Sequence, residues 1–126
     1  MKTYLLVLVS LVGADMVWLN FAAKAFYQKH LGYIFAEKFV LWPAVIFYLL
    51  YAFGVVYFVV NPALEARSLS LAIFRGALLG LLAYGAYDLT NHATLAKWPL
   101  VITISDLAWG VFVTAFASTV AYVILK

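Results

Sequence analysis

The sequence predicts an all-α membrane protein in which four transmembrane helices form a compact bundle. Three observations support this fold class. Of the 126 residues, 68% are hydrophobic and only 10% are charged, whereas soluble domains carry about 25% charged residues. A chain this short could not bury so much apolar surface in one core in water. We therefore expect residues 1–126 to form a single transmembrane domain.

The composition also excludes several classes of function. The formal net charge of +3 is small and the cationic residues are scattered, so nucleic acid is not an expected partner. The chain has no cysteine, which excludes disulfides and thiolate metal sites. The sequence contains no phosphate loop, dinucleotide-binding turn or nucleophile elbow.

Four segments are apolar over the roughly 20 residues that a helix needs to cross a bilayer. The first follows a charged start that resembles a secretory signal, but its apolar run is too long for one, so we expect a retained helix. The second and fourth begin with Trp-Pro, at 42 and 98, which suits a first helical turn at the headgroup layer. Asn61-Pro62 is expected to end the second helix. The predicted spans are roughly 4–23, 42–60, 70–92 and 99–125.

Residues 24–39, between the first two spans, show helical periodicity with more polar residues. This pattern predicts an amphipathic helix lying in the membrane interface, and a plain polar loop is the alternative. The apolar residues that recur at near-helical spacing are Phe26, Tyr27, Leu31, Ile34, Phe35 and Phe39.

Three acids lie inside the predicted spans: Asp15, Asp88 and Asp106. Ionisable residues in such segments are costly and usually mark a functional site. Because alternate helices run in opposite directions, all three should lie within roughly 12 Å of one membrane face. Adjacent carboxylates cannot all stay ionised in a low dielectric without compensation. We expect them to take up protons, bind a cation or the positive part of a ligand, or accept hydrogen bonds, and they are the candidate catalytic residues if the protein is an enzyme.

Polar and aromatic side chains are expected to share this region with the acids. Trp18 and Trp109 each follow an acid by three residues, which places each pair on one helix face. The alternatives are ordinary roles, with the tryptophans as interface anchors and His92 in the headgroup layer. The ligand-binding residues expected from spacing and depth are Trp18, Asn20, Tyr84, Asn91, His92, Thr103 and Trp109.

A metal site would draw on the same acids. Asp88 and His92 lie four residues apart on one helix face, and Asp15 and Asp106 would complete the ligand set. Oxygen-rich ligands favour Mg, Ca or Mn, and the imidazole admits Zn. A divalent cation is therefore a cofactor that the sequence allows without requiring it.

Gly76 and Gly80 form a GxxxG motif, in which small residues let another helix approach closely. We expect this motif to pack the acid-bearing helices against each other within the chain. Homodimerisation through the same motif is the alternative.

The stretches "ADMVWL", "YDLTNHATLAKWPL" and "SDLAWG" together resemble the bacterial membrane-protein family named domain of unknown function 2177. The resemblance covers almost the whole chain. It implies a small four-helix protein of the bacterial inner membrane, and it implies no activity. It adds Tyr87 and Thr90 to the expected ligand-binding residues. In this chain, the residues that match the motifs of the family are Asp15, Trp18, Tyr87, Asp88, Thr90, Asn91, Trp98, Asp106, Trp109 and Gly110.

Three functions remain open at this point. The first is a site that binds or modifies a membrane lipid or another amphipathic molecule. The second is a small proton- or cation-coupled transporter, a dimer inserted in both orientations, because the eight lysines and arginines divide evenly between the two sides. This reading draws on a looser similarity to the small multidrug-resistance transporters. The third is an accessory subunit whose polar cluster only fixes helix packing.

Overall fold

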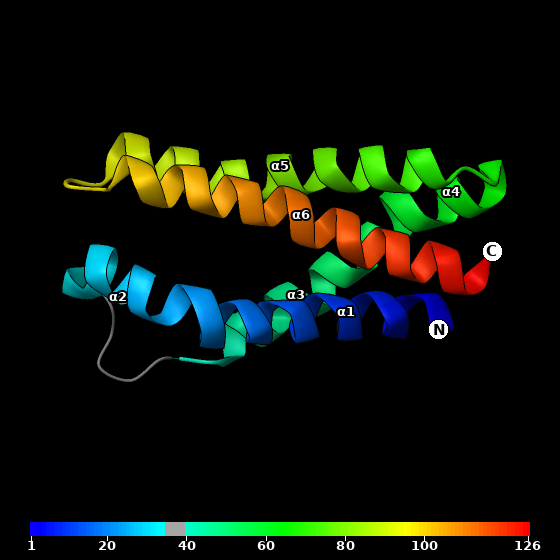
Figure 1. Ribbon diagram of the computed structural model, residues 1–126, viewed down its shortest axis with the longest axis horizontal. Coiled ribbons are helices and arrows are strands. Elements are labelled where there is room, and N and C mark those ends of the chain that lie inside the picture. Colours follow the sequence, from blue (N-terminus) through cyan, green and yellow to red (C-terminus); the bar gives the residue numbers. More distant parts are fainter. Residues whose placement is uncertain (35–39) are drawn as a thin grey trace.

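The computed structural model describes residues 1–34 and 40–126, without the side chains of residues 22–24. Within these residues, four helices are long and apolar enough to cross a membrane, which confirms the predicted fold class. Figure 1 shows an elongated bundle in which both termini lie at the same end. The four membrane-crossing helices are Lys2–Phe21, Trp42–Ala66, Leu69–Thr94 and Leu100–Leu125.

The first span does not end where the amphipathic segment begins. Helix α1 (Lys2–Trp18) runs on through a π-helical turn, η1 (Leu19–Ala23), into α2 (Lys24–Leu31) and a short 3₁₀ turn, η2 (Gly32–Ile34). The predicted amphipathic helix is thus helical over 24–34, and its remainder, 35–39, lies outside the described residues.

Helix α2 extends α1 alongside the turn that joins α5 to α6 (Figure 1) instead of starting as a separate helix. The apolar face of α2 holds it in this position. Leu31 packs in one cluster with Trp98 and Ile102, and Phe26 and Tyr27 flank that cluster. Three residues of the face that suggested a membrane interface, Phe26, Tyr27 and Leu31, are therefore used for packing within the chain, whereas Ile34 is exposed.

The second span consists of α3 (Trp42–Val55), a π-helical turn, η3 (Val56–Val60), and α4 (Asn61–Ala66). The prediction that Asn61-Pro62 ends this helix is wrong. Pro62 lies at the start of α4, directly after the π-helical turn η3, and the helical span continues past it to Ala66. The chain leaves α4 at Arg67, which has the left-handed conformation with φ 53°.

Helices α5 (Leu69–Thr94) and α6 (Leu100–Leu125) form an antiparallel hairpin in which the backbones touch. A Cβ added at Gly80 would lie 2.0 Å from the carbonyl oxygen of Gly110. A Cβ added at Gly76 would lie 2.9 Å from the Cα of Ala115. The predicted internal packing role of the GxxxG motif is therefore confirmed, and this contact fixes the register of the two helices.

The apolar core lies toward the end of the bundle that carries the termini. It contains Val7 and Leu11 of α1, Val55 of α3, and Val113 and Ala117 of α6. Many large apolar side chains cover the outside, as expected when the surrounding solvent is lipid. The acids of α1 and α6 lie beyond this core, toward the opposite end.

Candidate functional site

Asp15 and Asp106 line one small pocket with a volume of about 180 Å³. Every membrane-crossing helix contributes to it, together with η1 and α2. The tertiary fold therefore gathers into one place residues that are up to 94 positions apart in the chain, such as Asp15 and Trp109. The lining residues are Asp15, Trp18, Leu19, Tyr27, Tyr48, Tyr84, Asp106 and Trp109.

Asp15 is held by two hydrogen bonds from neighbouring helices. The Tyr48 hydroxyl of α3 donates to Oδ2 at 2.5 Å, and the Trp109 indole N–H of α6 donates to Oδ1 at 2.6 Å. The side chain is only 8% exposed. Asp15 therefore links α1 to two other spans, and both donors are neutral groups that leave the charge of an ionised carboxylate uncompensated.

Asp106 lies across the pocket and is partly buried. The hydroxyl of Tyr27 in α2 donates a hydrogen bond to its Oδ1. This contact depends on the π-helical turn η1, since the extra residue of such a turn changes which face of the following helix points inward. Leu19, the first residue of η1, is itself part of the pocket wall.

Aromatic rings form most of the pocket wall. Trp18 and Trp109 stack with ring centroids 4.6 Å apart and an interplanar angle of 10°. The Tyr84 ring lies directly on Gly110, where an added Cβ would come within 2.3 Å of the ring. Gly110 therefore has a positional role, because any side chain there would displace Tyr84 from the site.

Asp88 is placed apart from the other two acids. It is fully buried, it does not line the pocket, and neither of its carboxylate oxygens has a hydrogen-bond partner within the described part of the chain. It lies one turn beyond Tyr84 on α5, where that helix packs closely against α6. The structure thus brings together two of the three predicted acids.

His92 and Thr103 belong to a second polar group at the α5–α6 turn. The Trp98 indole N–H donates to the Thr103 hydroxyl at 3.0 Å, and that hydroxyl lies 3.1 Å from Nδ1 of His92. Since the indole can only donate, the threonine proton is available for the imidazole nitrogen. These side chains hold the turn together and do not line the Asp15–Asp106 pocket.

The remaining expected ligand-binding residues also lie outside this pocket. Asn20 is exposed and donates to the Met16 carbonyl at 2.8 Å. Thr90 donates to backbone carbonyls of its own helix, and Tyr87 is exposed beside the edge of Trp98. Asn91 is half-buried near the end of α5.

The structure gives no support to the suggested metal ligands as a set. Within residues 1–34 and 40–126, no three His, Asp or Glu side chains come close enough to hold a metal ion. Asp15 and Asp106 share a pocket that neither Asp88 nor His92 lines. The arrangement instead combines carboxylates with aromatic rings.

Two pocket residues, Tyr48 and Tyr27, are not among the site residues expected from the sequence. No acid occurs in the predicted second span, so nothing marked Tyr48 among its many aromatic neighbours. The sequence pattern places Tyr27 on the apolar face of the expected interfacial helix. The available signal was that a tyrosine hydroxyl inside a bilayer needs a hydrogen-bond partner.

An apolar groove between α1 and α6 adjoins the pocket, with a volume of about 530 Å³. Trp109 lines both the groove and the pocket. Trp109 therefore lies between the polar pocket and the apolar groove. Its lining residues are Val9, Ser10, Gly13, Ala14, Val17, Trp109, Phe112, Phe116 and Val120.

Four membrane-crossing helices around a polar pocket define a multi-pass membrane protein. A family model described as "Predicted membrane protein (DUF2177)" matches residues 1–123, and the chain belongs to this family. The family resemblance inferred from the sequence motifs is thereby confirmed. No curated protein and no solved structure matches the chain.

Proposed function

We propose that the protein binds an amphipathic molecule, such as a lipid, whose polar head group carries a positive charge. The observation that carries this proposal is the composition of the pocket. Among its eight lining side chains, two are carboxylates, five are aromatic and none is basic. The proposal makes Asp15 and Asp106 binding residues for the head group.

The chemistry of the pocket favours a cation. The described donors to Asp15 and Asp106 are tyrosine hydroxyls and an indole N–H, which are neutral. An ionised carboxylate in a low-dielectric site is costly without a compensating charge. The faces of Trp and Tyr rings also attract ammonium groups. A cationic head group therefore satisfies both the carboxylates and the rings.

The apolar groove between α1 and α6 supplies the place for the tail. It meets the pocket at Trp109 and is lined almost entirely by apolar residues. A ligand with its head group between the carboxylates would extend its chain along this groove toward the bilayer. Such a ligand would enter sideways from the membrane, without passing through the apolar core.

The test compares probes that share one alkyl chain and differ in charge. Dodecyltrimethylammonium and uncharged dodecanol are titrated into protein in non-ionic detergent micelles. Binding is followed by the intrinsic tryptophan fluorescence, to which Trp18 and Trp109 of the pocket contribute. We expect the cationic probe alone to bind in the pocket. Asp106→Asn should weaken binding of the cationic probe about tenfold, as for the loss of one charge-assisted contact. The substitution should preserve the structure, because the amide oxygen can still accept the hydrogen bond from Tyr27.

Glu65→Gln is the matched control, since Glu65 is an exposed acid of α4 outside the pocket. It removes the same charge and should leave binding unchanged. Equal affinity for both probes, or equal binding by wild type and Asp106→Asn, would contradict the proposal.

Proton-coupled transport of the same cation is the second candidate function, and Asp88 favours it. A fully buried carboxyl group without a described hydrogen-bond partner is suited to carrying a proton, a common role of acids within membranes. We expect Asp88→Asn to abolish flux driven by a pH gradient in proteoliposomes while binding of the cationic probe persists. The variant would be reconstituted as a dimer. Normal pH-driven flux in this variant would exclude a proton-carrying role for Asp88.

The bacterial inner membrane is the location that we propose with this function. The support is the family resemblance together with the four helical spans. Fractionation of inner and outer membranes would locate the protein directly.

A further inference from the structure

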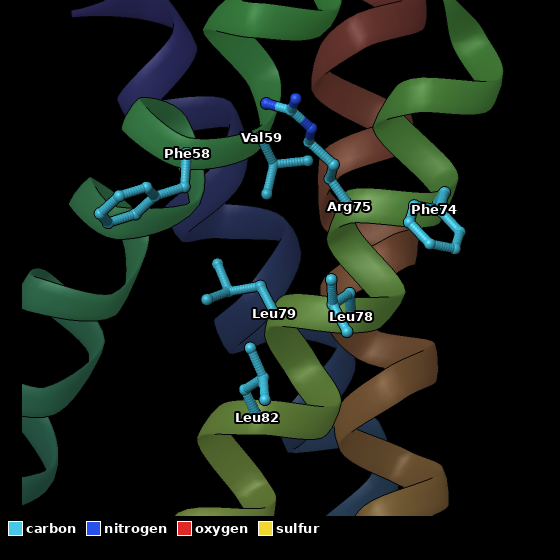
Figure 2. Close-up of a pocket in the computed structure, with 7 residues that line it drawn as sticks. All are labelled: Phe58, Val59, Phe74, Arg75, Leu78, Leu79 and Leu82. Atoms are coloured by element: carbon cyan, nitrogen blue, oxygen red, sulfur yellow. The ribbon is translucent and has the colours of Figure 1, made fainter.

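We propose that a second groove, between η3 and α5, binds an anionic phospholipid whose phosphate contacts Arg75. The groove has a volume of about 370 Å³ and is shown in Figure 2. Six of its seven lining residues are apolar, and Arg75 carries the single charge. It shares no residue with the Asp15–Asp106 pocket. The lining residues are Phe58, Val59, Phe74, Arg75, Leu78, Leu79 and Leu82.

The depth of Arg75 matches that of a phospholipid head group. Arg75 follows the start of α5 at Leu69 by six residues, which corresponds to about 9 Å along the helix. Figure 2 shows its guanidinium beside Val59, at the end of the groove opposite Leu82. The side chain thus extends toward the start of α5 and the membrane surface, as long cationic side chains in spanning helices commonly do.

The groove is complementary to both parts of an anionic phospholipid. A guanidinium can donate two parallel hydrogen bonds to a phosphate group. Leu78, Leu79 and Leu82 continue from Arg75 along α5, and Phe58 stands on the opposite wall (Figure 2). One acyl chain would lie against these residues while the phosphate lies at Arg75. The charge of Arg75 selects an anionic lipid over a zwitterionic one.

The experiment measures which lipid stays bound to the purified protein. The protein is equilibrated with equimolar phosphatidylglycerol and phosphatidylcholine in non-ionic micelles, and retained lipids are counted by native mass spectrometry. Wild type should retain phosphatidylglycerol preferentially. Arg75→Gln should reduce that preference about fivefold, as for the loss of one cationic side chain near a membrane surface.

Arg67→Gln is the matched control, because Arg67 is exposed in the connection before α5 and does not line the groove. It removes the same charge at the same end of the bundle and should leave the preference intact. An equal decrease in both variants would show a diffuse charge effect and overturn the site. Absence of any preference in wild type would overturn it as well.

Leu82→Trp tests the groove without changing any charge. Leu82 is 61% exposed, so the larger side chain should be tolerated by the fold while it narrows the acyl-chain path. Retention of phosphatidylglycerol should fall, and unchanged retention would contradict the groove. Binding of dodecyltrimethylammonium should be normal in Arg75→Gln and Leu82→Trp, because this lipid site is independent of the pocket at Asp15 and Asp106.

Discussion

At the scale of single residues, Asp15 is the side chain that ties the site to the bundle. Its oxygens accept from α3 through Tyr48 and from α6 through Trp109. Hydrogen bonds between helices in a membrane stabilise by about 0.6 kcal/mol on average, with a maximum of about 1.7. These two hydrogen bonds therefore contribute modestly to the stability of the fold.

We expect Tyr48→Phe to lower the free energy of unfolding by about 0.6–1.7 kcal/mol, because it removes one hydrogen bond between helices. Unfolding by sodium dodecyl sulfate, followed by circular dichroism, measures the loss. Tyr57→Phe serves as the control, since Tyr57 is 61% exposed on η3. Equal losses in the two variants would show that the Tyr48 hydroxyl has no special role.

At the scale of elements, the α5–α6 hairpin is the rigid frame of the site. Contact between Gly80 and Gly110 sets the register that places Tyr84 in the pocket. Because the atoms in contact belong to the two backbones, neither can move aside without separating the helices. This explains why a motif of two glycines can determine the position of a tyrosine one turn further along.

Gly80→Ala should destabilise the protein by about 1–3 kcal/mol or more, the usual cost of overpacking. The added Cβ would lie 2.0 Å from the Gly110 carbonyl oxygen, which is a backbone atom of the neighbouring helix. Gly54→Ala is the control, because a Cβ there meets nothing within 4 Å. The same unfolding titration compares them, and a Gly80→Ala variant as stable as Gly54→Ala would disprove the close backbone contact.

The π-helical turn η1 allows a second prediction at the element scale. Deletion of Phe21, which is 86% exposed, should rotate α2 by about 100° relative to α1. Tyr27 would then turn away from Asp106, and binding of the cationic probe should weaken severalfold. Phe21→Ala keeps the register and should bind normally. Normal binding by the deletion variant would show that η1 does not orient α2.

At the scale of the whole molecule, the arrangement of the spans places the termini and the α4–α5 connection at one end (Figure 1). The α5–α6 turn lies at the other end, near α2. The chain has no cysteine, so single cysteines can be introduced without further changes.

Ser68→Cys and Ala96→Cys should therefore react with a membrane-impermeant maleimide from opposite sides of the membrane. Intact spheroplasts and inside-out vesicles provide the two measurements. If the protein inserts in both orientations, each cysteine should be half accessible from each side. Labelling of both positions from the same side only would contradict the four-span topology.

The sequence predicted the depth of polar groups better than their direction around each helix. The spans and the approach of Asp15, Trp18 and Trp109 to one region followed from length and spacing. The direction of Asp88 did not, because the spanning helices are apolar on nearly all sides and no stripe shows which face points inward. Tertiary packing at Gly80 and Gly110 decides that rotation.

The same limit explains the differences at the ends of elements. Asn61-Pro62 carries a strong helix-ending signal, yet η3 and α4 continue the span to Ala66. A π-helical turn depends on how the preceding and following helices pack, so local sequence alone does not reveal it. The position of Tyr27 in the pocket could not be predicted either, because it depends on the π-helical turn η1 that precedes α2.

The depth of Asp106 has an electrical consequence. It follows the start of α6 at Leu100 by six residues, so a cation bound there lies about 9 Å along the spanning helix, close to a third of a hydrocarbon core about 30 Å thick. One elementary charge crossing the full membrane changes energy by about 2.3 kcal/mol per 100 mV. A cationic ligand entering from the nearer face would thus gain or lose about 0.7 kcal/mol per 100 mV, a factor of about three in affinity. The membrane potential would itself tune the occupancy of the pocket.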